Sequence, residues 1–349
     1  EATRNSFGQW LTVGDEPADK LVAWMSEVGM AHGRKLLDEA LEHGIHTLTD
    51  APAPLREFMA IVDTPPAWLD ETKLLDGQLA SHRCGRKALY VLRDVSLMGG
   101  YQSSGINKTL VMTGALTKGA LKREGETTQF WMDITTPNAM KRYSTGFKTT
   151  VRVRVMHAMV RRHVAKHPDW RADEWGLPIN QADMLVTNHA FSVILLFGVR
   201  LMGMILSQRE SHGIMHLWRY VGWLLGIDEH LLTDNEMQGR KDLYLATVTQ
   251  PAPDDSSWQL ADSLRQVPLN RAYPRWQWGR ARLEYERHLS VTRFFIGRAG
   301  MKALHLPSKL PWYPPLVLPF KLLIETLECT VPYGKRLGQR IGRTREQAY

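Results

Sequence analysis

The chain has 349 residues, of which 44% are hydrophobic and 23% charged. This composition excludes disordered, collagen-like and low-complexity proteins, and the two cysteines are too few for a disulfide scaffold or a four-thiolate zinc site. The net charge of +8 is concentrated in two stretches, which points to acidic partners at particular places.

The predicted elements are helical along the whole chain, because apolar residues recur at three- and four-residue spacing and convincing period-2 runs are scarce. The run Val151–Val155 alternates, but it continues into Met156–Val160 without a break, which favours a helix. In chain order, helices are predicted over residues 17–42, 54–63, 86–98, 109–128, 147–166, 180–207, 209–226 and 281–303.

Two proline-rich stretches, Pro251–Ser257 and Pro307–Pro319, have the composition of linkers, but the second contains Trp312 and Tyr313 and is expected to pack across the body. The organisation we expect is one all-α domain over 1–349, with a core at about 64–226, N-terminal helices over 1–63 and a C-terminal arm at about 305–349. The apolar run Phe191–Leu206 contains Arg200 and is shorter than the roughly 20 residues of a membrane span, so we expect a core helix there.

The first basic stretch, Lys141 to Arg171, contains Asp169 as its only acidic residue and predicts the neighbourhood of an anionic ligand. The second stretch suits an acidic surface such as phospholipid headgroups, or it serves only solubility. Its basic residues are Lys335, Arg336, Arg340, Arg343 and Arg345. Nucleic acid is not an expected partner, because neither stretch has aromatic-basic interleaving, zinc-finger spacing or a helix-turn-helix signature.

The residues Glu1–Asn5 lack the features of a signal peptide. Of the possible locations, the sequence favours the cytoplasm or the periphery of a membrane without deciding between them.

His157 projects from the apolar face of its predicted helix, with Val153 and Val160 beside it. Such a ring is either a core histidine bonded to a carbonyl group or a ligand. Arg154 and Arg161 flank the same face, which suits haem, because its iron takes a neutral imidazole and its two propionates pair with guanidinium groups.

Arg123 and Thr127 are four residues apart on a predicted helix, with Glu126 between them. They form either a polar distal pocket or an exposed face with an Arg–Glu pair. The pairs His163/His167 and His212/His216 have a spacing that can chelate a metal, although no third ligand is evident. Nucleotide-binding, serine-hydrolase and zinc-protease motifs are absent from the sequence.

Several motifs, in this order and spacing, resemble the oxygenase family that contains latex-clearing protein (rubber oxygenase) and the fungal MpaB enzymes. They are Thr64-Pro-Pro-Ala-Trp-Leu-Asp70, Thr113-Gly-Ala-Leu116, Arg123-x-x-Glu-Thr127, Val151–Arg161, Trp175–Met184, Trp218–Gly222 and Leu225-Gly226. The resemblance implies an all-α fold with a globin-like core and accessory helices around a b-type haem.

The resemblance also implies site residues. His157 would be the proximal iron ligand, Arg123 and Thr127 distal residues, and Thr187 a further pocket threonine. Glu126 stands where the family has a lysine that can close the distal iron site, and the region Tyr101–Asn107 offers no acid to match the family's catalytic glutamate. Glu126 is therefore the candidate base.

The expected function is that of a haem-b-dependent oxygenase, which activates O2 to oxidise or cleave a C=C bond of an apolar isoprenoid or lipid-like substrate. One alternative is a non-catalytic haem- or lipid-binding module at a membrane surface. A metalloenzyme that uses one of the histidine pairs is another.

Overall fold

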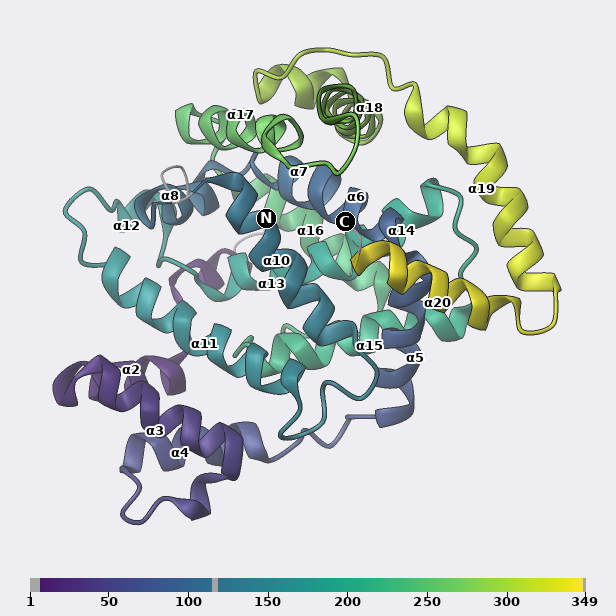
Figure 1. Ribbon diagram of the computed structural model, residues 1–349. Coiled ribbons are helices and arrows are strands. Elements are labelled where there is room, and N and C mark those ends of the chain that lie inside the picture. Colours follow the sequence, from purple (N-terminus) through teal and green to yellow (C-terminus); the bar gives the residue numbers. More distant parts are fainter. Residues whose placement is uncertain (1–6, 115–118, 348–349) are drawn as a thin grey trace.

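The computed structural model describes residues 7–114 and 119–347, and every regular element within them is helical (Figure 1). The all-α prediction is confirmed. The first part of the chain forms η1 (Gln9–Thr12), α2 (Glu16–Val28), α3 (Met30–His43), η2 (Ile45–Thr47) and α4 (Ala53–Asp63).

The central part contributes most of the main hydrophobic core, to which Leu21 and Phe58 of the N-terminal helices also belong. Its elements are α5 (Glu71–Cys84), α6 (Arg86–Tyr90), the π-helical η3 (Val91–Leu97), α7 (Met98–Gly100), α8 (Ser104–Met112), α10 (Ala120–Thr135), α11 (Thr145–Val164), α12 (Ala172–Trp175), α13 (Gln181–Phe191), α14 (Val193–Leu201) and α15 (Gln208–Leu224). The C-terminal part comprises α16 (Glu236–Thr249), α17 (Asp255–Asn270), α18 (Gln277–Ala303), α19 (Tyr313–Thr330) and α20 (Gly334–Gln347).

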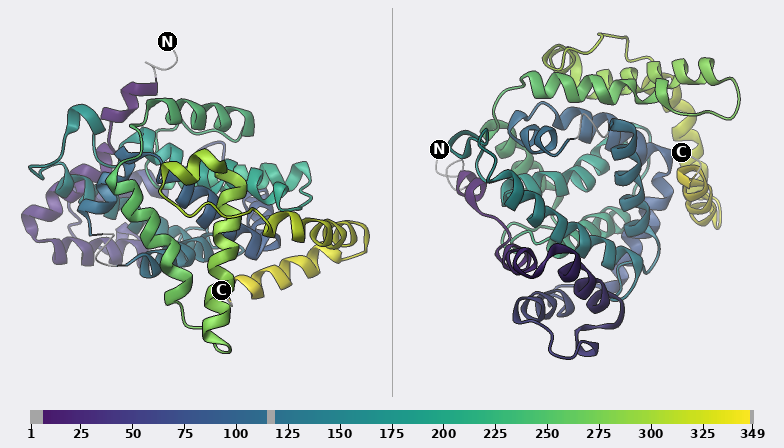
Figure 2. Two further views of the ribbon diagram at one scale, coloured as in Figure 1. Left: turned by 90° about the horizontal axis from the view of Figure 1, so that it is seen from above. Right: turned by 60° about the vertical axis from the view of Figure 1, so that its left-hand side comes forward.

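Accessory helices surround the core on several sides. Figure 2 shows α17 and α18 along one side, the N-terminal helices α2 to α4 at the opposite end, and α19 and α20 along a third edge. The core itself is centred on stacked aromatic rings, because Trp218 of α15 lies 5.9 Å from Trp131 of α10 and 4.6 Å from Phe191 of α13 between ring centroids. This cluster joins three helices that are distant in sequence.

Several predicted helices are interrupted where the backbone leaves the helical region. The helix predicted over 17–42 is two helices, α2 and α3, separated by Gly29 at φ 99°. The single helix predicted over 109–128 is wrong, because α8 ends at Met112 and α10 begins only after Gly119 at φ 82°. The helix predicted over 180–207 is likewise divided at Ser192.

The stretch Pro307–Pro319 was predicted to be a linker, yet α19 begins at Tyr313 inside it. Proline is tolerated in the first turn of a helix, where the missing N–H has no intrahelical partner, and α19 also accommodates Pro319. Among the described residues, one helical stretch, Gln181–Leu201 of α13 and α14, is long and apolar enough to cross a membrane. Because 56% of its apolar window is buried inside the molecule, we read it as the expected core helix.

Candidate functional site

Helices α10 and α11 form the walls of the candidate site. They meet near the end of α10, where the Thr149 hydroxyl donates a hydrogen bond to the Asp133 carboxylate at 3.2 Å, and they diverge from that point (Figure 1). We call the two helix faces that carry the candidate residues the wedge. It is defined by Val153, His157 and Val160 on α11 and by Arg123 and Thr127 on α10.

One side of α11 is buried against the body of the protein and the other is left partly open. Val151 and Ala158 have no exposed surface, whereas Val153 and Val160 are only half-buried and Met156 is 44% exposed. A stripe of apolar side chains that the protein leaves uncovered is typical of a binding surface for an apolar molecule.

His157 lies in the middle of this open stripe. The ring is half-buried, and its Nδ1 atom is buried without a hydrogen-bond partner. Desolvation, followed by the positive charge of Arg161, lowers the pKa of His157 to about 4. The imidazole is therefore neutral at physiological pH and keeps a lone pair, which is the form that binds iron.

Arg154 and Arg161 lie beside His157 but bind carboxylates of α2. Arg154 donates from Nε and Nη2 to Asp15 at 2.7 and 2.8 Å, and Arg161 donates from Nε to Asp19 at 3.0 Å. This geometry assigns Arg154 to the contact between α2 and α11. Arg161 also donates to a backbone carbonyl and retains a buried Nη2 atom without a partner, so its pairing with a cofactor carboxylate stays a prediction.

Further basic residues of the first stretch are neutralised in the same way, although Arg162 and Lys166 are exposed. Lys148 and Arg152 bind Glu42 of α3, and Arg142 binds Asp63 of α4. The expectation that this stretch marks an anionic ligand is corrected for Arg142, Lys148 and Arg152, because their partners are carboxylates of the chain's own N-terminal helices.

On α10, the face that carries Thr127 is buried at both ends and exposed to solvent in the middle. Trp131, one turn after Thr127, has no exposed surface, and Glu124 near the start of the helix is 6% exposed, yet Thr127 itself is exposed. Arg123 is half-buried, and its charge partly opposes the burial that raises the pKa of Tyr101 to about 12. The structure thus places Arg123 and Thr127 on one open surface.

Glu126 lies at the outer rim of α10. Its side chain is 65% exposed and its carboxylate is 3.9 Å from the Lys122 ammonium group. The expected Arg–Glu pair is therefore replaced by a Lys–Glu pair, and the role of Glu126 as a base stays a prediction.

Helix α13 carries Thr187, which is exposed and donates its hydroxyl proton to the backbone carbonyl of Asp183 at 2.8 Å. The Asp183 carboxyl accepts hydrogen bonds from Asn180 and Gln250, each at 2.8 Å, and burial raises its pKa to about 7. This proton-holding acid was not predicted, although it lies within the Trp175–Met184 motif. His189 of the same helix pairs with Asp242 at 3.1 Å.

A buried charge network behind Arg123 was also missed. Glu124 lies 3.3 Å from Arg93 and 3.2 Å from Arg271, and Asp94 lies 2.7 Å from His288. Their separation along the chain leaves no local signal in the sequence.

In the region predicted to offer no acid, Asn107 donates its amide protons to the Tyr101 carbonyl at 2.7 Å and to the Ser257 hydroxyl at 3.0 Å. Asn107 therefore serves as a buried hydrogen-bond donor between α8 and α17. Two residues of the Thr113–Leu116 motif, at positions 115 and 116, lie outside the described residues.

The two histidine pairs do not come together with further ligands. His163, His167 and His212 are exposed, whereas the Nε2 atom of buried His216 accepts a hydrogen bond from the backbone of Asp70 at 2.9 Å. Across 7–114 and 119–347, no group of three His, Cys, Asp or Glu side chains is placed to hold a metal ion.

Two hollows lie outside the wedge. One of about 730 Å³ lies between the start of α10 and α17, and one of about 490 Å³ lies between α15 and the start of α16. Neither is lined by a residue of the predicted haem site, and the second is lined by His212 of the His212/His216 pair.

Comparison with known proteins agrees with the sequence motifs. The rubber oxygenase of Streptomyces sp. (strain K30) is 26% identical over 231 residues, which is 63% of this chain and 54% of the relative. The chain thus matches about half the length of that curated relative. The solved structure of latex clearing protein LCP in the closed state superimposes with a TM-score of 0.70 at 19% identity, covering 97% of this chain and 91% of that one, and therefore shares its fold.

A family model described as "ER-bound oxygenase mpaB/B'/Rubber oxygenase, catalytic domain" matches residues 83–327. This span contains both helices of the wedge. The chain belongs to the family of MpaB and rubber oxygenase catalytic domains.

Proposed function

We propose that this protein is a haem-b-dependent oxygenase that uses O2 to oxidise or cleave a C=C bond of an apolar isoprenoid or lipid-like substrate. The observation that carries the proposal is His157: a neutral, half-buried imidazole with an unpartnered buried nitrogen, in an apolar stripe of the wedge. Family membership supports the oxygenase class, and the name of the similar rubber oxygenase supports an apolar alkene.

The residues of the wedge fit a haem group. His157 would hold the iron through a neutral nitrogen, Val153 and Val160 would cover the apolar macrocycle, and the free Nη2 atom of Arg161 is the donor left for a carboxylate. When bound, haem would supply the redox chemistry that activates dioxygen.

The side chains of the wedge would orient a small polar molecule and bind the apolar substrate. Arg123 and Thr127 provide a guanidinium group and a hydroxyl on an otherwise apolar surface, so they can orient a small polar molecule by hydrogen bonds. Phe130 of α10 and Phe191 of α13 contact each other, with ring centroids 6.4 Å apart, and add apolar surface. An alkene would be bound through its apolar area, at about 25 cal/mol per Å² buried.

The first test is His157→Ala. Since the variant removes the ring that would hold the iron, we expect a folded helical protein that has lost the Soret band. His163→Ala is the matched control, because His163 is an exposed histidine on the same helix, and it should keep the full spectrum. Full haem content in His157→Ala would contradict the assignment.

The second test concerns turnover. Arg123→Ala and Thr127→Ala should retain haem but consume O2 more slowly with an isoprenoid substrate, because neither residue is expected to bind iron. Wild-type protein that binds haem but consumes no O2 with any alkene would instead indicate the non-catalytic binding module.

A further inference from the structure

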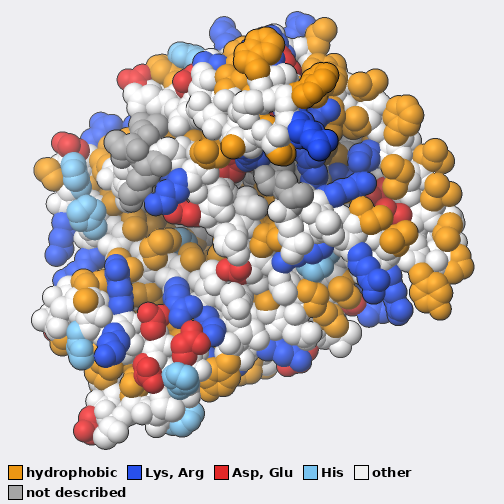
Figure 3. Space-filling model, viewed as in Figure 1, with side chains coloured by type: hydrophobic (Ala, Val, Ile, Leu, Met, Phe, Trp, Pro, Cys, Tyr) orange, Lys and Arg blue, Asp and Glu red, His pale blue; other side chains and the backbone are white. Residues whose placement is uncertain are grey.

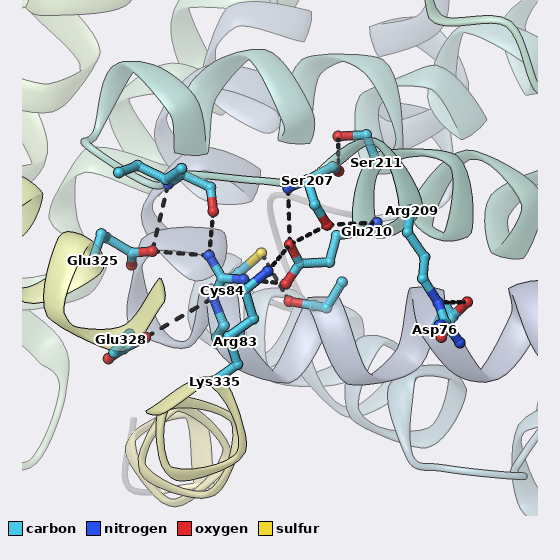
Figure 4. A network of polar contacts seen from close by, with 12 residues as sticks. Asp76, Arg83, Cys84, Ser207, Arg209, Glu210, Ser211, Glu325, Glu328 and Lys335 are labelled. Carbon is cyan, nitrogen blue, oxygen red and sulfur yellow. Dashed lines mark hydrogen bonds and ion pairs between the residues drawn. The ribbon is translucent and has the colours of Figure 1, made fainter. Parts of the chain in front are cut away.

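Helix α19 turns its charged side toward the protein and its apolar side toward solvent. The Glu325 carboxylate is 2% exposed, lies 2.9 Å from the Arg83 guanidinium and also binds Lys87. Glu328 lies 3.9 Å from the same guanidinium group (Figure 4). This arrangement reverses that of an ordinary surface helix, which buries its apolar face.

The outward side of α19 is a continuous apolar stripe, visible as hydrophobic side chains along the right-hand edge of Figure 3. Its members are Leu316 (59% exposed), Phe320 (68%), Leu323 (61%), Ile324 (47%) and Leu327 (53%). An apolar stripe of this kind, fixed in place by buried ion pairs, marks a surface that another apolar phase covers.

Helix α20 continues the stripe and adds positive charge. Leu337 is 60% exposed, Ile341 is 39% exposed, and Tyr333 just before the helix is 76% exposed. Arg336, Arg340 and Arg345 are exposed around them, whereas the acidic residues of α19 and α20, namely Glu325, Glu328 and Glu346, are at least partly buried and ion-paired. The exposed charge of this surface is therefore positive.

Two of the five tail cations are used inside the protein. Lys335 binds Glu210 of α15 at 2.9 Å, and Arg343 donates to the Met132 carbonyl of α10 at 3.0 Å. They fasten α20 to the core, so the exposed arginines project from a helix with a fixed orientation.

We propose that the outer faces of α19 and α20, which we call the α19–α20 face, bind the surface of an anionic lipid bilayer. Hydrocarbon would cover the apolar stripe, and lipid phosphates would pair with Arg336, Arg340 and Arg345. A second copy of the chain suits the face less well, because a two-fold contact places the same patch on both subunits and would bring like charges together without exposed carboxylates to pair them. The proposal rests on this surface alone and not on the proposed oxygenase activity.

The test is vesicle co-sedimentation of the full chain with phosphatidylcholine vesicles that contain or lack phosphatidylserine, at low and high salt. The charge variant is R336Q/R340Q/R345Q and the apolar variant is F320S/L323S/L327S. Each cation near an anionic surface contributes about fivefold to binding. The charge variant should therefore lose at least about tenfold in binding to anionic vesicles at low salt, and the apolar variant should bind weakly at either salt concentration.

Matched controls change equivalent residues elsewhere. K35Q/R162Q/K166Q removes exposed cations from α3, α11 and the turn after α11, and M237S/Y244S removes exposed apolar side chains from α16. Both controls should bind as the wild type does. The proposal would be overturned if the wild-type protein did not sediment with anionic vesicles, or if the apolar variant bound them as well as the wild type does. A wild-type dimer that the apolar variant converts to a monomer would overturn it in favour of a contact between copies.

Discussion

The ion pair between Asp15 and Arg154 offers a test of how the candidate site is built. Arg154 is 4% exposed and donates hydrogen bonds from Nε and Nη2 to the carboxylate of Asp15, which is 3% exposed. Asp15→Asn removes the negative charge but keeps an oxygen that can cap α2, where Asp15 accepts a hydrogen bond from the Ala18 backbone. The variant therefore isolates the uncompensated charge of Arg154.

The expected loss is about 3–5 kcal/mol, the usual result of leaving one partner of a buried pair without its counter-charge. At roughly 2.1 cal/mol/K of unfolding entropy per residue, this 349-residue chain has about 0.7 kcal/mol/K, so Tm should fall by about 4–7 °C. Thermal unfolding followed by circular dichroism measures the change.

Two further measurements test whether the Asp15–Arg154 pair is the source of the lost stability. Asp15→Asn/Arg154→Met removes both charges and should recover most of the lost Tm, since a buried pair replaced by apolar groups is close to neutral. The Asp15 charge raises the pKa of His157, so its removal leaves the ring neutral and the haem spectrum unchanged. A double variant no more stable than Asp15→Asn would show that the pair is not the source of the effect.

Three further predictions follow from particular contacts. Gly226→Ala should lower Tm at least as much as Asp15→Asn, because a Cβ atom would lie 2.2 Å from the Asp15 carboxylate at a residue with φ +85°; an unchanged Tm would contradict this. Burial raises the pKa of Asp183 from 3.8 to about 7, so the folded state holds a proton that the unfolded state releases, and wild type should lose stability relative to Asp183→Asn as pH rises from 5 to 8. Arg83→Met should leave the buried Glu325 without its strongest partner and speed limited proteolysis within α19, whereas Arg209→Met, at an exposed pair with Asp76, should not.

The sequence predicted the helical class because apolar periodicity is local. The apolar face that singled out His157 is half-buried in the structure, and its role as an iron ligand stays a prediction. The sequence did not predict the partners of Arg154 and Arg161. Asp15 and Asp19 lie more than a hundred residues away, and the residues around a basic side chain do not indicate which distant carboxylate it pairs with. The break at Gly29 was missed because apolar periodicity continues across this glycine, while its positive φ ends α2; Gly119, also at positive φ, instead precedes the first residue of α10.

The linker expectation for Pro307–Pro319 holds for residues 307–312, which lie outside any helix, and is wrong from Tyr313 onward. Proline lacks a backbone N–H donor, but the first turn of a helix does not need that donor for an intrahelical hydrogen bond. The helix α19 can therefore begin within the proline-rich stretch. The inward carboxylate of Glu325 binds Arg83 and Lys87. These residues are more than two hundred positions away, so no local sequence pattern predicts the contacts.

The contacts of α11 divide its surface into two parts with different roles. Buried ion pairs attach the N-terminal helix α2 to one side, through Arg154 and Arg161, while the neighbouring side with Val153 and His157 stays open. Because the buried ion pairs lie on the first side, we expect the free energy that holds α11 in place to come from that side and from the core. Replacing His157 should therefore remove the cofactor without unfolding the helix, and replacing Asp15 should loosen the helix without removing the cofactor. A His157→Ala variant that loses both haem and helicity would show that the cofactor, rather than the α2 contact, holds α11.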